Sequence, residues 1–171
     1  MSLVWYTTAE FPADTVVDTN DYCGMNRQAL TQATAVERAV EDLLAHVREI
    51  EFPKAPRRIC SFVAVPWPSK KPSQGEGIRF LKDVEYETLP EPPGQGTHCY
   101  RVVPTKGGQR WMVDEGLVDE LVRKWGSLSA EQAMDLAWAY WAGEIWHSIS
   151  YLLNGEVKVL RACDDPTFQN V

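Results

Sequence analysis

The succession of two hydrophobic patterns limits most strongly what this 171-residue chain can fold into. Short runs of β-branched and aromatic residues predict four strands, over 3–8, 58–65, 98–103 and 157–162. Between these runs, apolar residues recur every three or four positions, which is the spacing of one helix face. Strands and helices do not alternate regularly, so the pattern argues against a doubly wound parallel sheet. It predicts an α+β fold, which we assign to a single domain over 1–171.

The first helical segment carries its own start and stop signals. Thr34 followed by Glu37 is a capping-box signature, in which each side chain bonds the other residue's backbone N–H. Pro53 requires the helix to end before it, because proline has no N–H to donate. We expect the apolar face of this helix to pack against the sheet, and its members are Val36, Val40, Leu43, Leu44, Val47 and Ile50.

The C-terminal half predicts a hairpin and two further helices. A strand over 98–104 and another over 109–113 are joined by a glycine-rich turn, which is typical of a hairpin. One helix is expected from Asp114, and another after Ser129, where Gln132 completes a second capping box. Both helices then end at glycines, which favour helix termination.

Four aromatic residues cluster within nine positions of the last helical segment: Trp138, Tyr140, Trp141 and Trp146. Helical spacing directs Trp138 toward the core. The other three cannot all point the same way as Trp138, so we expect at least one of them to be partly exposed.

The segment 66–77 has the composition of an exposed loop. It holds three prolines and two glycines among its twelve residues. A domain boundary there would leave two small pieces, so we expect a long mobile loop inside one domain. A short edge strand is expected beyond it, over 84–88.

Charge and hydropathy exclude two classes of partner. The formal net charge is -7 and no window is dominated by Lys or Arg, so duplex DNA is not expected as a partner. No apolar run approaches the ~18 to 20 residues that a membrane span requires, and no basic region followed by an apolar one stands at the N-terminus. We therefore expect a cytoplasmic protein that binds no membrane.

Cysteine and histidine usage predicts neither disulfides nor a metal site. Cys23, Cys60, Cys99 and Cys163 are widely separated and form no CxxC pair, so we expect four reduced, mostly buried thiols. The three histidines are scattered, whereas even a minimal catalytic zinc site needs three protein ligands.

Motifs for several common enzyme classes are absent from the sequence. It contains no GxGxxG, GxxxxGK[ST] or GxSxG pattern, so neither a phosphate-binding glycine loop nor a serine nucleophile elbow is predicted. The carboxylate pairs at 114–115 and 164–165 favour a hydrolase only weakly. Paired catalytic carboxylates must face each other across a cleft, and these are sequence neighbours.

Five blocks of sequence, taken together, carry a family resemblance. They are 5–8, 58–62, 100–104 with 113–114 after it, 139–143 and 150–159. Their order resembles the small ADP-ribosyltransferase-like proteins of tailed phages and mobile elements, over most of the chain. The resemblance implies a split or strongly bent, mainly antiparallel sheet that grips NAD in a cleft. It also implies transfer of ADP-ribose to a protein or nucleic-acid acceptor.

The resemblance assigns candidate site residues and shows where this chain departs from the family. The family's first strand usually supplies an Arg or His to NAD, whereas this strand supplies Tyr6 and Thr7. The usual catalytic Glu is replaced by Ser150, which has no charge to stabilise the positive centre formed as nicotinamide leaves. Glu144 is the candidate substitute. The implied catalytic residues are Glu144 and Ser150, and the implied NAD contacts are Tyr6, Thr7, Arg58, Ser61, Tyr100 and Trp141.

Two functions are compatible with this pattern. The first is an NAD-cleft protein, atypical or catalytically decayed, with a protein acceptor. Arg58 and Ser61 point to opposite faces of a regular strand. Both can therefore contact one phosphate only if Arg58 lies at the end of the strand, and Arg57 can fill that role equally well. The alternative is a non-enzymatic phage or mobile-element protein that acts as an acidic, Trp-rich module for binding a host protein.

Overall fold

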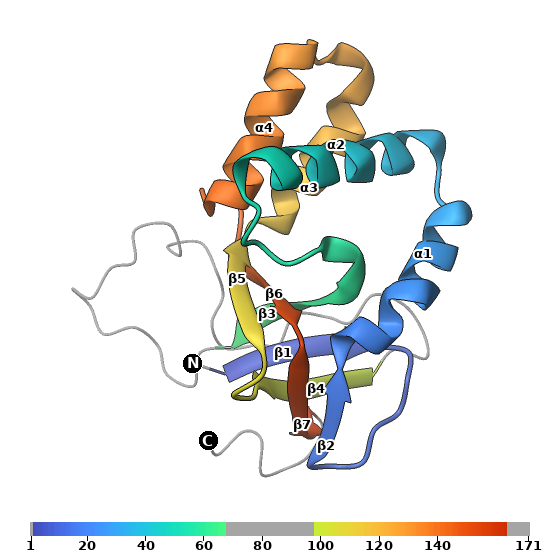
Figure 1. The fold of residues 1–171 in the computed structure, drawn as a ribbon, viewed down its shortest axis with the longest axis vertical. Coiled ribbons are helices and arrows are strands. Elements are labelled where there is room, and N and C mark those ends of the chain that lie inside the picture. The colour runs from blue at the N-terminus through green and yellow to red at the C-terminus, as the bar shows by residue number, and fades with distance from the viewer. Residues whose placement is uncertain (1, 68–97, 164–171) are drawn as a thin grey trace, which may run out of the picture.

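The computed structural model describes residues 2–67 and 98–163, and Figure 1 shows their arrangement. These residues form seven strands: β1 (Ser2–Thr7), β2 (Thr15–Asp18), β3 (Ser61–Trp67), β4 (His98–Pro104), β5 (Gln109–Val113), β6 (Ser150–Asn154) and β7 (Glu156–Ala162). They also form the helices α1 (Cys23–Thr31), α2 (Ala35–Glu51), α3 (Glu115–Lys124) and α4 (Ala130–Ala142). Short 3-10 turns are η1 (Thr19–Tyr22), η2 (Arg58–Cys60) and η4 (Trp125–Ser127). The predicted combination of an antiparallel sheet with packed helices is confirmed.

All seven strands belong to one antiparallel sheet in the order β2-β7-β4-β1-β3-β6-β5. In Figure 1, β5, β6, β7 and β2 run vertically across β1, β3 and β4, which run horizontally, so the sheet is strongly bent. The corner between β6 and β7 is Gly155, whose φ of +86° favours glycine. Buried Thr19 holds this corner, because its hydroxyl accepts the Gly155 N–H at 2.8 Å.

One face of the bent sheet carries an aromatic core. Trp5 of β1 stacks on Phe62 of β3 with ring centroids 4.0 Å apart, and Tyr22 meets Phe62 edge-on. Side chains from six strands complete this core: Leu3, Val17, Ala64, Tyr100, Val102, Leu153, Val157 and Val159.

A second core lies between the helices and the β5–β6 end of the sheet. α2 contributes Val40, Leu44 and Val47 to it, and the sheet contributes Val113 and Leu152. α4 and α2 are also linked by a hydrogen bond, because the Trp141 Nε1–H donates to the Leu44 carbonyl at 2.8 Å. The predicted apolar face of α2 is therefore buried mainly against α3, α4 and this end of the sheet.

The helix boundaries follow the signals seen in the sequence. The Thr34 hydroxyl accepts the Glu37 N–H, and α2 ends two residues before Pro53. Ser129 and Gln132 form both bonds of the capping box. Gly143 ends α4 with a φ of +75°.

Two secondary-structure predictions are wrong, and one region holds elements for which no prediction was made. Residues 58–60 form the 3-10 turn η2, not the start of a strand, because the Cys60 N–H bonds the Arg57 carbonyl. Residues 15–31, over which the sequence predicts no helix or strand, contain β2, η1 and α1, and α1 buries no side chain that would mark it by an apolar period. The predicted hairpin of 98–104 with 109–113 does not form, since β4 pairs with β1 and β7 while β5 pairs with β6. β7 displaces β5 there, and Thr105 N–H bonds Glu156 O.

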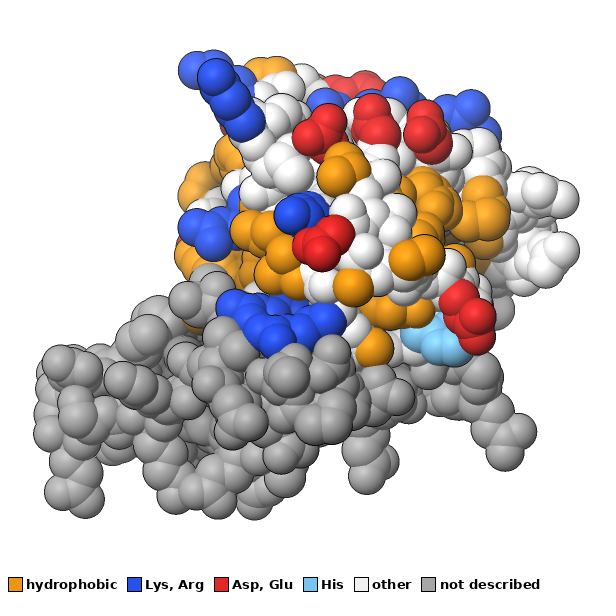
Figure 2. All heavy atoms as spheres, turned by 90° about the horizontal axis from the view of Figure 1, so that it is seen from below, with side chains coloured by type: hydrophobic (Ala, Val, Ile, Leu, Met, Phe, Trp, Pro, Cys, Tyr) orange, Lys and Arg blue, Asp and Glu red, His pale blue; other side chains and the backbone are white. Residues whose placement is uncertain are grey.

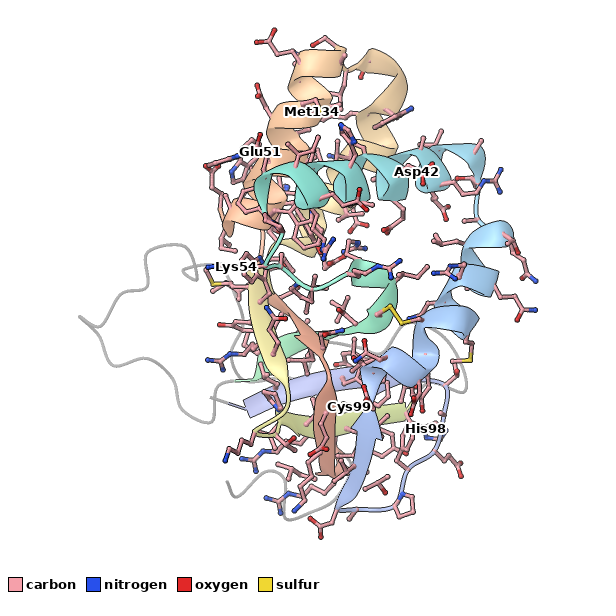
Figure 3. The ribbon with its side chains drawn as sticks, in the orientation of Figure 1. Asp42, Glu51, Lys54, His98, Cys99 and Met134 are labelled. Carbon is pink, nitrogen blue, oxygen red and sulfur yellow. A yellow bond between two sulfur atoms is a disulfide. The ribbon has the colours of Figure 1, made fainter. Side chains whose placement is uncertain are left out.

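The cysteine prediction is also wrong. Cys23 bonds Cys60, and Cys99 bonds Cys163, with Cα–Cα distances of 4.4 and 5.3 Å. The pairs are 37 and 64 residues apart in sequence, so only the fold brings them together. Figure 3 shows the Cys23–Cys60 bond in yellow between α1 and η2, with Cys99 labelled on β4.

Two expectations about the helix surfaces also change. Trp138 is 45% exposed and Ile50 is 60% exposed, so neither belongs to the core. The centroids of the Trp138 and Phe52 rings lie 5.6 Å apart. Met134, labelled in Figure 3, is also exposed and lies one turn earlier on α4. Trp146 is exposed, which confirms that at least one of the three neighbouring aromatic residues leaves the core.

Most of the predicted loop over 66–77 and the predicted strand over 84–88 lie outside the described residues. Residues 66 and 67 belong to β3. No helix within 2–67 or 98–163 is long and apolar enough to cross a bilayer.

Candidate functional site

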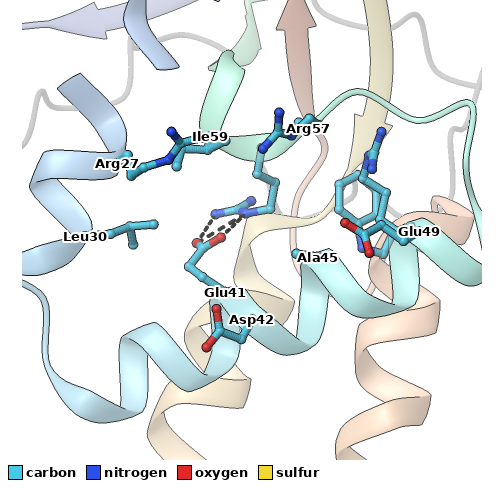
Figure 4. Close-up of a pocket in the computed structure, with 11 residues that line it drawn as sticks. Arg27, Leu30, Glu41, Asp42, Ala45, Glu49, Arg57 and Ile59 are labelled. Carbon is cyan, nitrogen blue, oxygen red and sulfur yellow. Dashed lines mark hydrogen bonds and ion pairs between the residues drawn. The ribbon is translucent and has the colours of Figure 1, made fainter. Parts of the chain in front are cut away.

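A cavity of about 170 Å³ lies where α1, α2 and residues 57–59 meet. Figure 4 shows it from close by, with Arg27 and Leu30 of α1 facing the acidic face of α2 and Arg57 coming from the segment that leads to β3. We call this cavity the arginine pocket. Its lining residues are Arg27, Leu30, Glu41, Asp42, Ala45, Arg48, Glu49, Arg57, Arg58, Ile59 and Trp141.

Helical spacing and η2 place the charged groups around the arginine pocket. Glu41, Ala45 and Arg48 lie three and four residues apart on α2, so they share one face. This face lies beside the one that carries Val40, Leu44 and Val47 into the core. η2 then turns the chain so that Arg57 and Arg58 both reach the same cavity, although they are sequence neighbours.

The Arg58 guanidinium group takes part in a network of hydrogen bonds and ion pairs inside the protein. Its Nε and Nη2 donate to the Glu41 carboxylate at 3.0 and 2.9 Å, and Figure 4 marks these bonds. Its Nη1 donates to Glu115 Oε1 at 2.5 Å and to the hydroxyl of Tyr140. The Tyr140 hydroxyl in turn donates to Glu115 Oε1 at 2.8 Å. The network joins η2 to α2, α3 and α4.

The same network shifts the pKa values of Tyr140 and Arg58. Burial raises the pKa of Tyr140 well above its ordinary value, and Glu115 adds to this, although the Arg58 charge opposes it. Burial alone would lower the pKa of Arg58, but Tyr140, Glu115 and Glu41 raise it well above its ordinary value. At neutral pH Arg58 is therefore a fixed cation and Tyr140 a neutral phenol.

The other arginines of the pocket differ in how they are bonded. Arg48 donates its Nε–H to the Ala55 carbonyl at 2.8 Å. Within 2–67 and 98–163, no hydrogen bond or ion pair engages the guanidinium of Arg27 or of Arg57, and both residues are exposed. The carboxylates of Asp42 and Glu49 are likewise unpaired among these residues. The cavity thus presents two unpaired guanidinium groups and two unpaired carboxylates.

The size of the arginine pocket limits what it can enclose. Sites that bury a whole drug-sized ligand usually measure about 300–1,000 Å³. A cavity of about 170 Å³ is large enough for a phosphate or pyrophosphate group and part of a sugar, but it cannot enclose a dinucleotide. A larger ligand would have to extend beyond it.

The structure brings two of the six predicted NAD contacts to this pocket. Arg58 and Trp141 both line it, but Arg58 is occupied by its internal partners. Trp141 is almost fully buried, and its indole N–H is used by the Leu44 carbonyl, so it forms part of the wall.

The other four predicted contacts lie elsewhere on the sheet. Tyr100 faces the aromatic core and its hydroxyl accepts the Phe11 N–H at 2.9 Å, whereas Tyr6 packs on the opposite face of the sheet. The Thr7 hydroxyl accepts the Ala9 N–H, and burial raises the pKa of Tyr6. The Ser61 hydroxyl donates to the Arg57 carbonyl at 2.7 Å and so stabilises η2.

Ser150 begins β6, and Glu144 lies six residues before it in the segment that follows α4. Ser150 is 3% exposed and pairs with Val113 of β5. The next residue, Asp114, is fully buried, and its carboxylate accepts the N–H groups of Gly116, Trp146 and His147 at 2.7–2.9 Å. Asp114 therefore fixes residues 146–147 against the start of α3. Glu144 is exposed and accepts the Trp146 indole N–H at 3.3 Å.

The end of the molecule opposite α3 and α4 carries side chains of several kinds. Figure 2 shows this end, where basic, acidic and hydrophobic side chains are interspersed. Lys158 of β7 pairs with Asp14 at 3.3 Å, and His98 Nε2 of β4 lies 3.5 Å from Glu10 Oε1.

Sequence reasoning missed Arg27, Asp42 and Glu49. Arg27 lies in a helix that the sequence analysis did not predict, and the two acidic residues belong to the polar face of α2, which is typical of a solvent-exposed helix face. Their shared position depends on tertiary structure. No local motif identifies it.

Comparison with models of known protein families found no match, and comparison with curated protein sequences found no significant similarity.

Proposed function

We propose that this protein binds the phosphate-bearing end of a nucleotide in the arginine pocket, on an ADP-ribosyltransferase-like fold that does not transfer ADP-ribose. One observation carries the proposal: the unpaired guanidinium groups of Arg27 and Arg57 line the same small cavity from two different elements. Guanidinium matches phosphate geometrically and electrostatically, since it can donate two parallel hydrogen bonds to it.

Arg58 supports this role without contacting the ligand. Its charge is held in place by Glu41 and Glu115, so it orients the wall from which Arg57 extends. The phosphate contact that the sequence offered to either arginine is therefore assigned to Arg57.

The unpaired carboxylates favour a nucleotide over bare phosphate. Asp42 and Glu49 line the same cavity as the two arginines, and a carboxylate accepts hydrogen bonds from sugar hydroxyl or base amino groups. A ligand with phosphate at one end and hydroxyl donors at the other can pair its phosphate with the arginines and its hydroxyl groups with the carboxylates. Inorganic phosphate leaves the carboxylates unpaired and repels them.

The side chains at and beside Ser150 support the proposal that this protein does not transfer ADP-ribose. The uncharged Ser150 is buried, and the carboxylate of neighbouring Asp114 is used by backbone N–H groups. A positive centre that forms as nicotinamide leaves needs a negative charge that is free to face it. We expect no nicotinamide to be released from NAD beyond the rate in buffer alone, and measurable release would contradict this part of the proposal.

Calorimetry with ADP, NAD, pyrophosphate and adenosine tests the binding site. We expect ADP and NAD to bind, pyrophosphate to bind more weakly, and adenosine not to bind. A charge-assisted hydrogen bond contributes about 1.5–3 kcal/mol, so Arg27→Ala and Arg57→Ala should each weaken ADP binding about 10- to 100-fold.

Arg123→Ala is the matched control for these variants. Arg123 is an exposed arginine on α3 that does not line the pocket, and its removal changes the net charge equally. It should leave the affinity for ADP within about twofold of the wild-type value, because distant exposed charges are screened by salt. Equal weakening by all three variants would indicate only a general charge effect and would overturn the site.

A further inference from the structure

The Cys23–Cys60 disulfide joins two of the elements that line the arginine pocket, α1 and the segment at η2. Cys23 is the first residue of α1, and Arg27 follows one helical turn later. Cys60 is the last residue of η2, and Arg57 directly precedes that turn. The covalent bond therefore links the two short elements that carry the unpaired arginines.

Packing does little to hold α1 in this position. None of the side chains of α1 is buried, in contrast to the three fully or almost fully buried side chains of α2. Within the described residues, two bonds connect α1 to η2: the disulfide, and a hydrogen bond from Asn26 Nδ2 to the Ile59 carbonyl at 2.8 Å. An element with few buried contacts opens locally at low free-energy cost unless a covalent bond restrains it.

From these observations we infer that the Cys23–Cys60 disulfide is a redox control on ligand binding in the arginine pocket: the oxidised protein binds and the reduced protein binds weakly. The inference rests on the proposed function, because it concerns the same site. The disulfide acts by setting the position of Arg27 relative to Arg57 before the ligand arrives.

The redox step needs a dithiol reductant. One thiolate of the reductant attacks Sγ of Cys23, which is partly exposed, while Cys60 is buried. The Cys23–Cys60 bond breaks, and Cys60 leaves as a thiolate that takes up a proton. The second thiol of the reductant then displaces Cys23, which is released as a thiol. Two electrons and two protons pass to the protein, and the reductant becomes its own disulfide.

After reduction, α1 retains the single hydrogen bond from Asn26 as its link to η2. The helix can then shift relative to η2, so binding a phosphate must also restrain Arg27. We expect the affinity for ADP to fall about tenfold or more.

The second disulfide provides a matched control within the same chain. Cys99–Cys163 joins β4 to the residue after β7 and lies outside the arginine pocket. It also pairs one partly exposed cysteine with one buried cysteine, so reductants meet a similar surface. The double variant Cys99→Ser with Cys163→Ser contains only the pocket disulfide and can be studied in both redox states.

The experiment measures ADP binding by calorimetry for this control variant before and after treatment with a dithiol. Thiol titration confirms the redox state, and circular dichroism confirms that the fold persists. We expect the affinity for ADP to fall about tenfold or more on reduction and to return on reoxidation. The variant Cys23→Ser with Cys60→Ser should bind weakly in either condition.

The outcomes separate the redox inference from the proposed function. If the oxidised protein binds ADP and the reduced protein binds it equally well, the redox inference is overturned while the binding site stands. If the oxidised wild-type protein does not bind ADP at all, the proposed function itself fails. Loss of the fold on reduction, seen by circular dichroism, would also overturn the inference, because the effect would then be global.

Discussion

The two helices α1 and α2 follow each other in sequence but are held in place by different forces. α2 buries Val40, Leu44 and Val47 in the helical core, whereas α1 buries no side chain and is bonded to η2 by a disulfide. Both helices line the arginine pocket, so one wall is set by packing and the other by a covalent bond. The difference shows that a binding site can combine a wall that is fixed by packing with a wall whose position depends on a disulfide bond.

The largest expected effects come from removing either disulfide, of which one holds α1. In the chain-entropy model, a cross-link that closes a loop of 37 residues contributes about 4 kcal/mol to the free energy of unfolding, and a 64-residue loop contributes slightly more. Replacing both cysteines of either pair by serine should therefore cost a similar amount, measured by urea denaturation. ADP binding should separate the two variants, since only the Cys23–Cys60 disulfide joins elements that line the pocket. A stability loss confined to the Cys99–Cys163 variant would remove the basis for the comparison.

A smaller difference is expected when one leucine is shortened in each helix. Leu44 of α2 is fully buried, so Leu44→Ala should lower the free energy of unfolding by about 3 kcal/mol, from lost transfer energy and the cavity that remains. Leu30 of α1 is only partly buried, and Leu30→Ala should cost less than about 1 kcal/mol. Chemical denaturation measures both. Equal losses would show that packing restrains α1 as firmly as α2.

The smallest expected effect concerns the network that joins η2 to the packed helices. The pKa of Tyr140 is raised in the folded protein, so its contribution to stability is fully present below the ordinary tyrosine pKa of 10.0 and is lost as pH rises through the folded value. Above about pH 10, stability should fall by up to about 1.4 kcal/mol per pH unit from this group.

Tyr140→Phe removes that alkaline dependence at the cost of two hydrogen bonds, one donated to Glu115 and one accepted from Arg58. Urea denaturation at about pH 9 and about pH 11 should show a shallower decline for the variant than for the wild-type protein. Tyr151→Phe is the control, because Tyr151 lies outside the Arg58 network and is only partly buried. An identical decline in the wild-type protein and in Tyr140→Phe would show that Tyr140 does not govern it.

Some parts of the fold were readable from local sequence because their signals lie within a few residues. Thr34 and Pro53 bracket α2, and Ser129 and Gly143 bracket α4, since caps and helix breakers act over one turn. Strand partners were not readable in the same way. The glycine-rich turn at 106–108 favours a hairpin locally, yet β4 pairs with β7, which lies about fifty residues further along the chain.

The candidate site was predictable only in part. Arg57 and Arg58 stand out because two arginines precede a strand, but nothing local shows that Arg58 is bound to Glu41, Glu115 and Tyr140. The missed α1 explains why Arg27 was not considered. A helix without a buried face has no hydrophobic period, and that period is the signal by which helices are found in sequence.

By itself, the sequence determined the α+β class, the ends of the long helices and the apolar faces that they bury, because these depend on backbone sterics, capping and the period of hydrophobic residues. Tertiary structure alone decided the strand order, both disulfides and the arginine pocket. Each of these joins residues that are far apart in the chain, such as Cys23 with Cys60 or Arg27 with Arg57. Such contacts are selected by the total free energy of packing the whole chain, and no single segment determines that free energy.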